Sequence, residues 1–471
     1  MEKIIRDAVI VGGGIGGLVT ACYLIKAGQK VSLIEAETEP GGLCRTIRKD
    51  NLTWNTSLYS LRGCQPGGPF HEILSELDLD DEITFIHSKR SYLIILDGIS
   101  FPITTEIDEI LTAADKLQGN GAKKIKPLLE RILQFNPVQD FPDLSGKTFH
   151  DVAQAHGICD LLLNALAAPF MISLGLPPKR TSAFFAFLKY QLLLKEGVSY
   201  PRGGAGHLVN KLADEFTSSG GELLLGQKVN EITEEPNGLK KVKTVGGLKR
   251  RGRHLVINGD ATWTMGMLGG GLPAKYHKKT ERLTPSLSAR LLFLAASKRN
   301  LAALHLNRYP HVIYLRNPDL DEVYNRIRKG GTDASSEVFG LTSPATWNFQ
   351  EASGEIQPLT AFFPYSLDRK NSGPSTDSLL KTIHVTSPKL SGDLSLKIAL
   401  NPEDIFRHTS NRAGSFCGWE MSPERYGPDR IPHRLSRRGI FLAGHWTDPG
   451  PSILNCALSG RKAAMSVLKS R

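Results

Sequence analysis

Cysteine pairs and long apolar runs, which mark disulfide, metal and membrane proteins, are missing from this sequence of 471 residues. Six cysteines are present, but they are scattered and none belongs to a CxxC pair. Their pattern argues against a disulfide framework or a zinc site and predicts reduced thiols in a cytoplasmic protein. No run of about 18 apolar residues is uninterrupted, so a membrane-spanning helix is not expected. The nearest run, Ile158 to Leu176, contains Asp160, Asn164 and Pro169.

Motifs of several large enzyme and binding classes are absent as well. The sequence has no P-loop, no Ser/His/Asp nucleophile elbow and no cluster of metal ligands, which argues against kinase, hydrolase and metal chemistry. No DNA-recognition helix, zinc finger or aromatic RNA-binding motif accompanies the formal net charge of +11, so nucleic acid is not expected as a partner. That charge leaves peripheral contact with an anionic membrane, or with an acidic carrier protein, open. The N-terminus has no small-residue cleavage site, and export is not expected.

A glycine-rich turn near the N-terminus is the strongest signal that is present. Residues 7–17 read DAVIVGGGIGG, an apolar strand that leads into Gly12-x-Gly14-x-x-Gly17. Apolar residues then recur at helical spacing, and a second short strand ends in Glu35. This order of strand, turn, helix and strand with a terminal acid is the context that a dinucleotide-binding fingerprint requires.

Each residue of this fingerprint has a physical task. Gly12 permits the tight turn, Gly14 lets the backbone approach a pyrophosphate, and Gly17 lets the helix pack closely on the strand. The N-terminus of the helix offers unpaired N–H groups and the positive end of its dipole to the phosphates. Glu35 is placed to accept hydrogen bonds from a ribose. We therefore predict that the chain binds a dinucleotide.

The end of the chain repeats part of this pattern. Residues 439–444 form an apolar strand that ends in Gly444, and Ile453 begins a closing helix. A parallel strand, a glycine and a helix N-terminus together make a second site for a phosphate or a flavin ring. Because no second complete GxGxxG occurs, we predict one dinucleotide bound by both chain ends, without a separate nicotinamide domain.

Two stretches in the middle of the chain have alternative interpretations. Residues 158–194 are dense in Leu, Phe and Ala, so they form either plain core or the wall of an apolar substrate cavity. Residues 240–253 carry seven lysines and arginines in a hairpin pattern. Such a hairpin is either a solvated face or a docking site for an acidic partner.

Three stretches together resemble the phytoene desaturase family, within the flavin amine oxidase and protoporphyrinogen oxidase group of FAD-dependent oxidoreductases. They are residues 8–46, 198–232 and 439–468. The middle stretch is the most family-specific, because Tyr200-Pro-Arg-Gly-Gly precedes a helix, Gly-Gly-Glu and a strand near Val229. The resemblance implies a desaturase or oxidase that introduces a double bond into a hydrophobic or natural-product-like substrate by hydride transfer to flavin N5.

The resemblance also implies how one FAD molecule is bound. The residues expected to hold it are Gly12, Gly14, Ile15 and Gly17 at the pyrophosphate, Glu35 at the ribose, Gly41, Gly42 and Arg45 beside the pyrophosphate and ribityl chain, Val229 at adenine, Gly444 and Asp448 at the phosphate and ribityl region, and Ile453 at the flavin ring.

The sequence does not assign a catalytic base. Tyr59, Arg202, His445 and Asp448 lie in segments expected near the flavin and are the candidates, although each also has a structural interpretation as a cap or a packing residue. The family often has an Asp-x-Gly turn where this chain reads WNTSLY at 54–59. Because of this departure, the resemblance does not decide whether the chain acts on the same substrate as the family.

The predicted fold is α/β, with a Rossmann-like FAD-binding lobe assembled from both chain ends and an inserted α+β substrate lobe. The FAD-binding lobe comprises residues 1–70, 196–265 and 436–471, and the substrate lobe comprises residues 71–195 and 266–435. Two functions from other classes stay open: a flavoprotein isomerase without net redox change, and a flavin-binding scaffold that docks an acidic partner.

Overall fold

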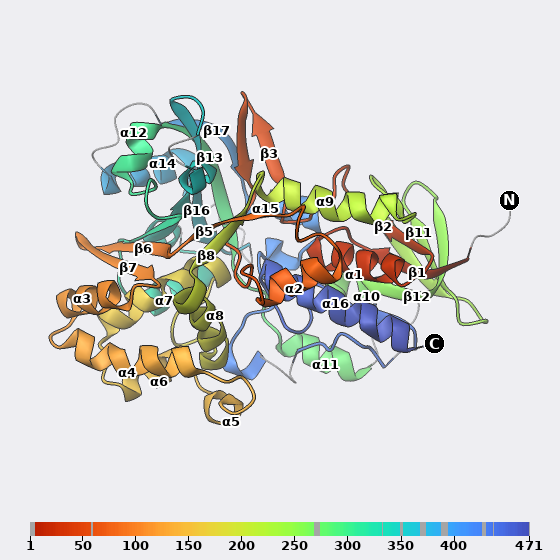
Figure 1. The fold of residues 1–471 in the computed structure, drawn as a ribbon, viewed down its shortest axis with the longest axis horizontal. Coiled ribbons are helices and arrows are strands. Elements are labelled where there is room, and N and C mark those ends of the chain that lie inside the picture. The colour runs from red at the N-terminus through yellow and green to blue at the C-terminus, as the bar shows by residue number, and fades with distance from the viewer. Residues whose placement is uncertain are drawn as a thin grey trace.

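Two lobes lie side by side in the computed structural model, and both chain ends are at the first of them (Figure 1). The structure describes residues 5–57, 60–267, 274–331, 333–348, 352–367, 374–387, 394–425, 430–436 and 438–470. The first lobe is built on one seven-stranded sheet and the second on another. The expected α/β architecture is confirmed.

The sheet of the first lobe collects strands from distant parts of the chain. Its order is β10–β11–β12–β1–β2–β9, and β18 also pairs with β12. Strands β12, β1, β2, β9 and β18 are parallel to their neighbours in this group, whereas β10 and β11 are antiparallel. Their bounds are β1 (Ile5–Val11), β2 (Val31–Ile34), β9 (Glu222–Leu224), β10 (Val229–Glu234), β11 (Lys240–Thr244), β12 (Lys249–Ile257) and β18 (Ile440–Leu442). The apolar run at 8–10 is fully buried because β1 lies in the centre of the sheet.

Helices from both ends of the chain cover this sheet together. Helix α1 packs against α16, and a Cβ on Gly460 would lie only 2.4 Å from the carbonyl oxygen of Gly16. Thr20 also donates a hydrogen bond of 3.0 Å to the Gly460 carbonyl. The two helices can approach this closely only because position 460 lacks a side chain. The helices of this lobe are α1 (Ile15–Lys26), α2 (Pro69–Glu76), α9 (Gly204–Ser218), α10 (Ala261–Gly266), α11 (Ala274–Arg282) and α16 (Ile453–Lys469).

The second lobe places a mainly antiparallel sheet beside a group of helices. The sheet order is β17–β13–β16–β15–β14–β6–β7, and only the β14–β6 pair is parallel. The strands are β6 (Arg90–Leu96), β7 (Ile99–Thr104), β13 (Ser288–Ser297), β14 (His311–Leu315), β15 (Val338–Thr342), β16 (Ile356–Tyr365) and β17 (Ser395–Leu400). The helices are α3 (Ile107–Leu117), α4 (Gly121–Gln134), α5 (Phe141–Leu144), α6 (Phe149–Ala155), α7 (Asp160–Leu174), α8 (Ala183–Glu196), α12 (Lys298–Ala303), α13 (Leu320–Arg328), α14 (Thr376–Thr386) and α15 (Pro402–Thr409).

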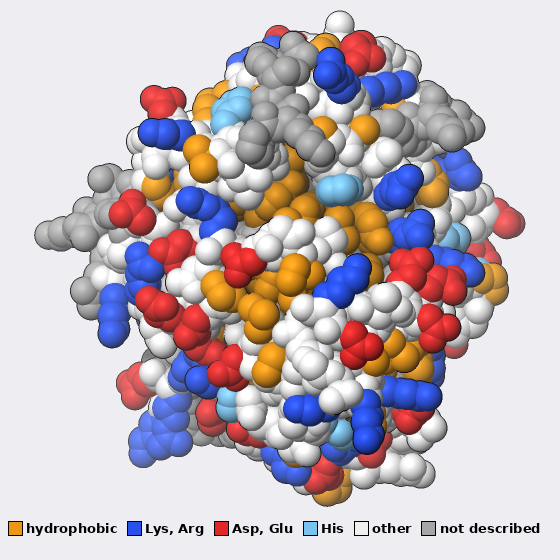
Figure 2. All heavy atoms as spheres, turned by 90° about the vertical axis from the view of Figure 1, so that its left-hand side faces the viewer, with side chains coloured by type: hydrophobic (Ala, Val, Ile, Leu, Met, Phe, Trp, Pro, Cys, Tyr) orange, Lys and Arg blue, Asp and Glu red, His pale blue; other side chains and the backbone are white. Residues whose placement is uncertain are grey.

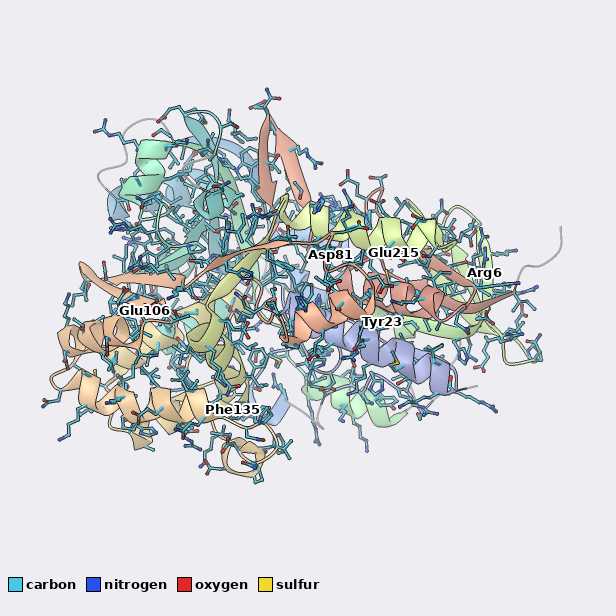
Figure 3. The ribbon with its side chains drawn as sticks, viewed as in Figure 1. Arg6, Tyr23, Asp81, Glu106, Phe135 and Glu215 are labelled. Carbon is cyan, nitrogen blue, oxygen red and sulfur yellow. The ribbon has the colours of Figure 1, made fainter. Side chains whose placement is uncertain are left out.

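Two small antiparallel sheets lie where the lobes meet. They pair β3 (Thr46–Lys49) with β4 (Leu52–Asn55), and β5 (Phe85–Ser88) with β8 (Val198–Pro201). The fully buried indole of Trp54 donates to the carbonyl of Leu294 over 2.9 Å, which ties β4 to the second sheet. Figure 3 shows Arg6 and Tyr23 in the first lobe and Glu106 and Phe135 in the second.

The basic hairpin forms β11 and β12, and acids neutralise much of its charge locally. Lys240 pairs with Glu234 over 2.9 Å, and Arg253 pairs with Asp7 over 2.6 Å. The other pairs are Lys243–Glu231, Arg250–Glu222 and Arg251–Glu235. On the opposite side of the molecule, the second-lobe face that Figure 2 shows, basic and acidic side chains are also mixed. The hairpin therefore offers little free charge to an acidic partner.

Membrane crossing was not expected from the sequence. Within the part of the chain that the structure describes, no helix combines the length and apolar character needed to cross a bilayer. All six cysteines are free thiols.

Candidate cofactor and substrate site

A large cavity of about 350 Å³ lies between the lobes. One part of its wall comes from the first lobe: the glycine turn after β1, the ends of β2 and β12, and the segment between β18 and α16. The other part, which we call the second-lobe wall, comes from β6, α7, α8, β16 and residues 416–417. The carboxyl ends of parallel strands therefore open onto the cavity, as is usual for nucleotide sites in open α/β sheets.

The glycine turn forms part of this wall. Gly12 has a φ of +102°, and a Cβ there would lie 2.3 Å from the carbonyl oxygen of Asn258. At Gly14 a Cβ would meet only the amide nitrogen of Asn258, at 3.1 Å. Gly14 precedes α1, whose first residue is Ile15. Its open side thus faces space that a pyrophosphate can occupy at a helix N-terminus.

Gly17 and Gly444 have different surroundings. A Cβ at Gly17 would lie 2.0 Å from the Gly12 carbonyl oxygen, so this residue serves the contact between helix and strand and does not line the cavity. Gly444 lines the cavity at a φ of +90°, and a Cβ there would lie 2.6 Å from the side-chain oxygen of Asn258. The N-terminal segment at Gly12 and the C-terminal segment at Gly444 therefore both contact Asn258.

Glu35 lines the cavity and is almost fully buried. Its carboxylate accepts hydrogen bonds from the backbone N–H groups of Gly13, over 2.6 Å, and Glu37, over 2.9 Å. Burial raises the pKa of Glu35, while these backbone N–H groups oppose that shift. The two bonds fix the carboxylate at the end of β2, in the position where a ribose is expected.

The other predicted cofactor residues divide into two groups. Gly41, Gly42, Val229 and Ile453 all line the cavity. Arg45 and Asp448 are not among the lining residues, because each side chain is held elsewhere. Arg45 forms an ion pair with Glu37 over 3.1 Å, and Asp448 forms one with Lys462 over 2.7 Å.

The catalytic candidates differ in whether they line the cavity. Arg202 is exposed and does not line the cavity. Tyr59 lies outside the described residues. His445 lines the cavity, and burial, reinforced by the charge of Arg430, lowers its pKa to about 4. Its buried Nε2 has no hydrogen-bond partner among the described residues. A neutral imidazole is therefore available to a bound molecule.

The apolar segment 158–194 serves both of its proposed purposes. Most of it is core, and Phe187 is fully buried against Phe135, with 5.7 Å between ring centroids. Only a few of its side chains, among them Phe185 and Ile172, belong to the second-lobe wall. Phe187 is thus a core residue and not part of the cavity wall.

Sequence reasoning missed several residues of this cavity. Asn258 lines it and donates from its side chain to the Gly12 carbonyl over 3.1 Å. Asp260, two positions later, caps α10 and accepts a 2.9 Å bond from the backbone of Arg412. The polar turn of residues 258–260, which reads Asn-Gly-Asp directly after β12, was the available signal for both. Lys189 and His408 had no comparable signal, because their neighbours in the cavity are distant in sequence.

The residues present fit an FAD molecule. The cavity offers an open helix N-terminus at Gly14, a fixed carboxylate at Glu35 and a buried nitrogen on His445 that is unpaired within the described part of the chain. Cys44 and Cys456 also line it, and burial raises the pKa of the Cys456 thiol to about 12. A thiol in this state is a poor nucleophile, which favours noncovalent binding.

Known proteins with similar sequences include carotenoid enzymes. The chain is 22% identical over 505 residues to a zeta-carotene-forming phytoene desaturase of Myxococcus xanthus, an alignment that covers 97% of this chain and 92% of that protein. It is 25% identical over 537 residues to a phytoene desaturase of Fusarium fujikuroi, with coverage of 100% and 90%.

Solved structures share the fold. A crystal structure of an oxidoreductase from Methanosarcina mazei matches with a TM-score of 0.67 and 17% identity, covering 98% of this chain and 99% of that one. A putrescine oxidase bound to putrescine matches with a TM-score of 0.65 and 14% identity, covering 99% and 100%. The family model of flavin-containing amine oxidoreductases matches residues 15–468. The chain therefore belongs to the flavin-containing amine oxidoreductase family and is an FAD-dependent oxidoreductase.

Proposed function

We propose that this protein desaturates an apolar, polyene-like substrate bound against the second-lobe wall. The observation that carries the proposal is the character of that wall, where aromatic and aliphatic side chains face the same cavity as the cofactor residues. They are Tyr92, Ile172, Leu174, Phe185, Phe362 and Phe416. Phe416 packs edge to face on Phe362, with 5.4 Å between the ring centroids. Side chains of this kind bind an apolar chain by removing its surface from water.

The charges near this wall disfavour an amine substrate. Arg62 is the charged basic residue there, and its side chain forms no hydrogen bond or ion pair with the described part of the chain. The carboxylates that line the cavity, Glu35, Glu37 and Asp260, all belong to the first lobe or its loops. An ammonium group beside this uncompensated guanidinium is unfavourable. A neutral polyene has no such cost, and the relatives named as phytoene desaturases support this choice.

The chain's residues divide the work of such a reaction. Bound FAD supplies the two-electron oxidation. Gly14, Glu35 and Gly444 hold and orient it, while the second-lobe wall positions the substrate and excludes water. His445 stays neutral at physiological pH because of its lowered pKa, so it contacts the bound molecules without adding charge.

Anaerobic mixing with phytoene in detergent micelles tests the proposal. The flavin absorbance should bleach, and the product should have lost two hydrogens by mass spectrometry. Putrescine serves as the matched amine and should leave the flavin oxidised. Bleaching by putrescine but not by phytoene would contradict the proposal. Isomerised phytoene of unchanged mass, formed without net electron transfer to an acceptor, would establish the isomerase alternative.

A further inference from the structure

One of the two lysines on the apolar helix α8 points to a second role for the second-lobe wall. Lys189 lies four residues after Phe185 and four before Leu193, so it falls on the buried face of the helix. Its side chain is 5% exposed and lines the cavity. Lys195, on the same helix, is exposed to solvent. A fully buried lysine is rare unless an acid accompanies it.

Among the residues that the structure describes, none that contacts the Lys189 amine is an acid. The amine donates to the hydroxyl of Ser173 and lies 3.4 Å from the carbonyl oxygen of Pro169, both on α7. It also lies 5.1 Å from the centre of the Phe170 ring. Among the described residues no carboxylate forms an ion pair with it. Within the described part of the chain, the groups in contact with the amine are therefore all uncharged.

The charged and titratable groups around Lys189 favour its uncharged form. Burial lowers its pKa well below the usual value, and the positive charge of Arg62 lowers it further. The thiol of Cys417, which donates to the Ser173 carbonyl over 3.0 Å, acts weakly in the opposite direction. Burial raises the pKa of that thiol to about 12, so it stays protonated and does not compensate a lysine charge. An uncharged amine has a free lone pair, which is the property of a base.

We propose that Lys189 accepts the proton that leaves the substrate when the double bond forms. This inference rests on the proposed desaturation. Two hydrogens leave adjacent carbons: one departs with its bonding electrons to the oxidised flavin, and the other departs as a proton. The Nζ lone pair takes this proton, the remaining C–H electrons become the second bond, and the amine becomes an ammonium. The ammonium returns its proton to water when the product leaves.

Reductive labelling tests whether the amine is uncharged and open to the cavity, independently of turnover. The purified flavoprotein is treated at pH 7 with decanal and sodium cyanoborohydride, which converts a neutral amine into a stable secondary amine. Peptide mass spectrometry should show faster modification of Lys189 than of Lys195, because ordinary lysines are mostly protonated at this pH. An unmodified Lys189 in protein whose surface lysines are labelled would overturn the proposal.

Flavin reduction in a single turnover tests the proton transfer itself. Lys189→Met and Lys189→Arg should both slow reduction by phytoene by roughly 10²–10⁴-fold, because neither side chain accepts a proton near neutral pH. The pH dependence of the step should disappear with them. Lys195→Met is the matched control and should leave the rate unchanged. Flavin content and melting temperature distinguish a loss of the fold from a loss of proton transfer. Ser173→Ala keeps the Lys189 amine and removes the hydroxyl to which it donates.

The outcomes distinguish the two proposals. Phytoene reduction at the parent rate and pH profile in a folded Lys189→Met variant would overturn the role of Lys189 and leave the desaturase function intact. A parent protein whose flavin no polyene reduces would overturn the desaturase function and the proton-acceptor role together.

Discussion

Asn258 illustrates how one side chain shapes the cofactor part of the cavity. Its side-chain amide donates a hydrogen bond to the Gly12 carbonyl. Its side-chain oxygen would lie only 2.6 Å from a Cβ on Gly16 and 2.6 Å from a Cβ on Gly444. Glycine is therefore required at these positions for different physical reasons. Gly12, Gly16 and Gly444 keep the backbone in contact with Asn258, whereas Gly14 leaves an open side toward the cavity.

Substitution of Gly14 by valine should abolish FAD binding while the protein remains folded. The new side chain would occupy the space that a pyrophosphate needs, and it would displace little besides the Asn258 amide. Gly17→Ala should behave in the opposite way and lower stability, because its Cβ would lie 2.0 Å from a backbone oxygen. Flavin absorbance and thermal melting distinguish the two variants. Normal flavin content in Gly14→Val would show that the turn is only structural.

His445 should make the folded state sensitive to mild acid. Its pKa is about 4 in the folded protein and about 6.5 when unfolded, so the unfolded state binds more protons between these values. The corresponding stability is fully present above pH 6.5 and is lost as the pH falls toward 4. The free energy of unfolding, measured with urea, should fall between pH 7.5 and pH 5. This fall should be about 2 kcal/mol larger in the parent than in His445→Gln. Equal pH dependence in both proteins would argue against a buried neutral imidazole.

Helix α8 shows how one element serves the core and the site together. Phe187 faces other aromatic rings of the second lobe, whereas Phe185 and Lys189 face the cavity. Because α8 is apolar on nearly all sides, its sequence does not reveal which face meets the cavity. Only the packing partners of the helix decide this.

Phe187→Gln should cost about 3 kcal/mol or more in the free energy of unfolding. The substitution removes a fully buried ring and leaves an amide without partners in the core. Phe185→Leu, at the cavity, should cost less than about 1.5 kcal/mol and change the relative rates of polyenes of different length. Urea unfolding and turnover measured on the same preparations test both statements. A stable Phe187→Gln protein with altered substrate preference would place Phe187 at the cavity after all.

The basic hairpin should contribute to stability and not to cofactor binding. Arg250 donates to Glu222 over 2.9 Å and is the chief cause of the lowered pKa, about 2, of that carboxyl group. Arg250→Ala should lower stability by less than about 1 kcal/mol, because the pair is partly solvated. FAD titration should give the parent's affinity. A loss of flavin in this variant would show that the hairpin supports the site.

The whole molecule joins the first and last parts of the chain into one lobe. Strand β18 extends the sheet that β1 begins, and α16 packs against α1. The cofactor cavity is therefore complete only when both chain ends are folded. The boundaries of the five segments that the sequence assigns to the two lobes remain a prediction.

FAD should be released intact when the purified protein is heated. The residues that we expect to hold the cofactor offer backbone N–H groups and a carboxylate, and the buried Cys456 thiol is protonated. The supernatant of heat-precipitated protein should contain all of the flavin, identified as FAD by chromatography. Flavin that stays attached to a tryptic peptide containing Cys44 or Cys456 would show a covalent link instead.

The glycine fingerprint, the flanking strands and the terminal acid predicted, from the sequence alone, residues that line the cavity. These signals are local, because a strand, a turn and a helix N-terminus only a few residues apart suffice to build a phosphate site. The closing strand and Ile453 were predictable for the same reason. The resemblance to phytoene desaturases gave the chemistry to expect.

The tertiary structure decided what faces the cavity from elsewhere. Arg45 and Asp448 are within sequence reach of the site, yet their side chains pair with Glu37 and Lys462. Lys189 is hidden in an apolar helix and reaches the cavity only because α7 and α8 pack together beneath it. Burial and charge environment depend on contacts between distant segments, and these set the protonation of a lysine or histidine. Local sequence patterns contain no such information.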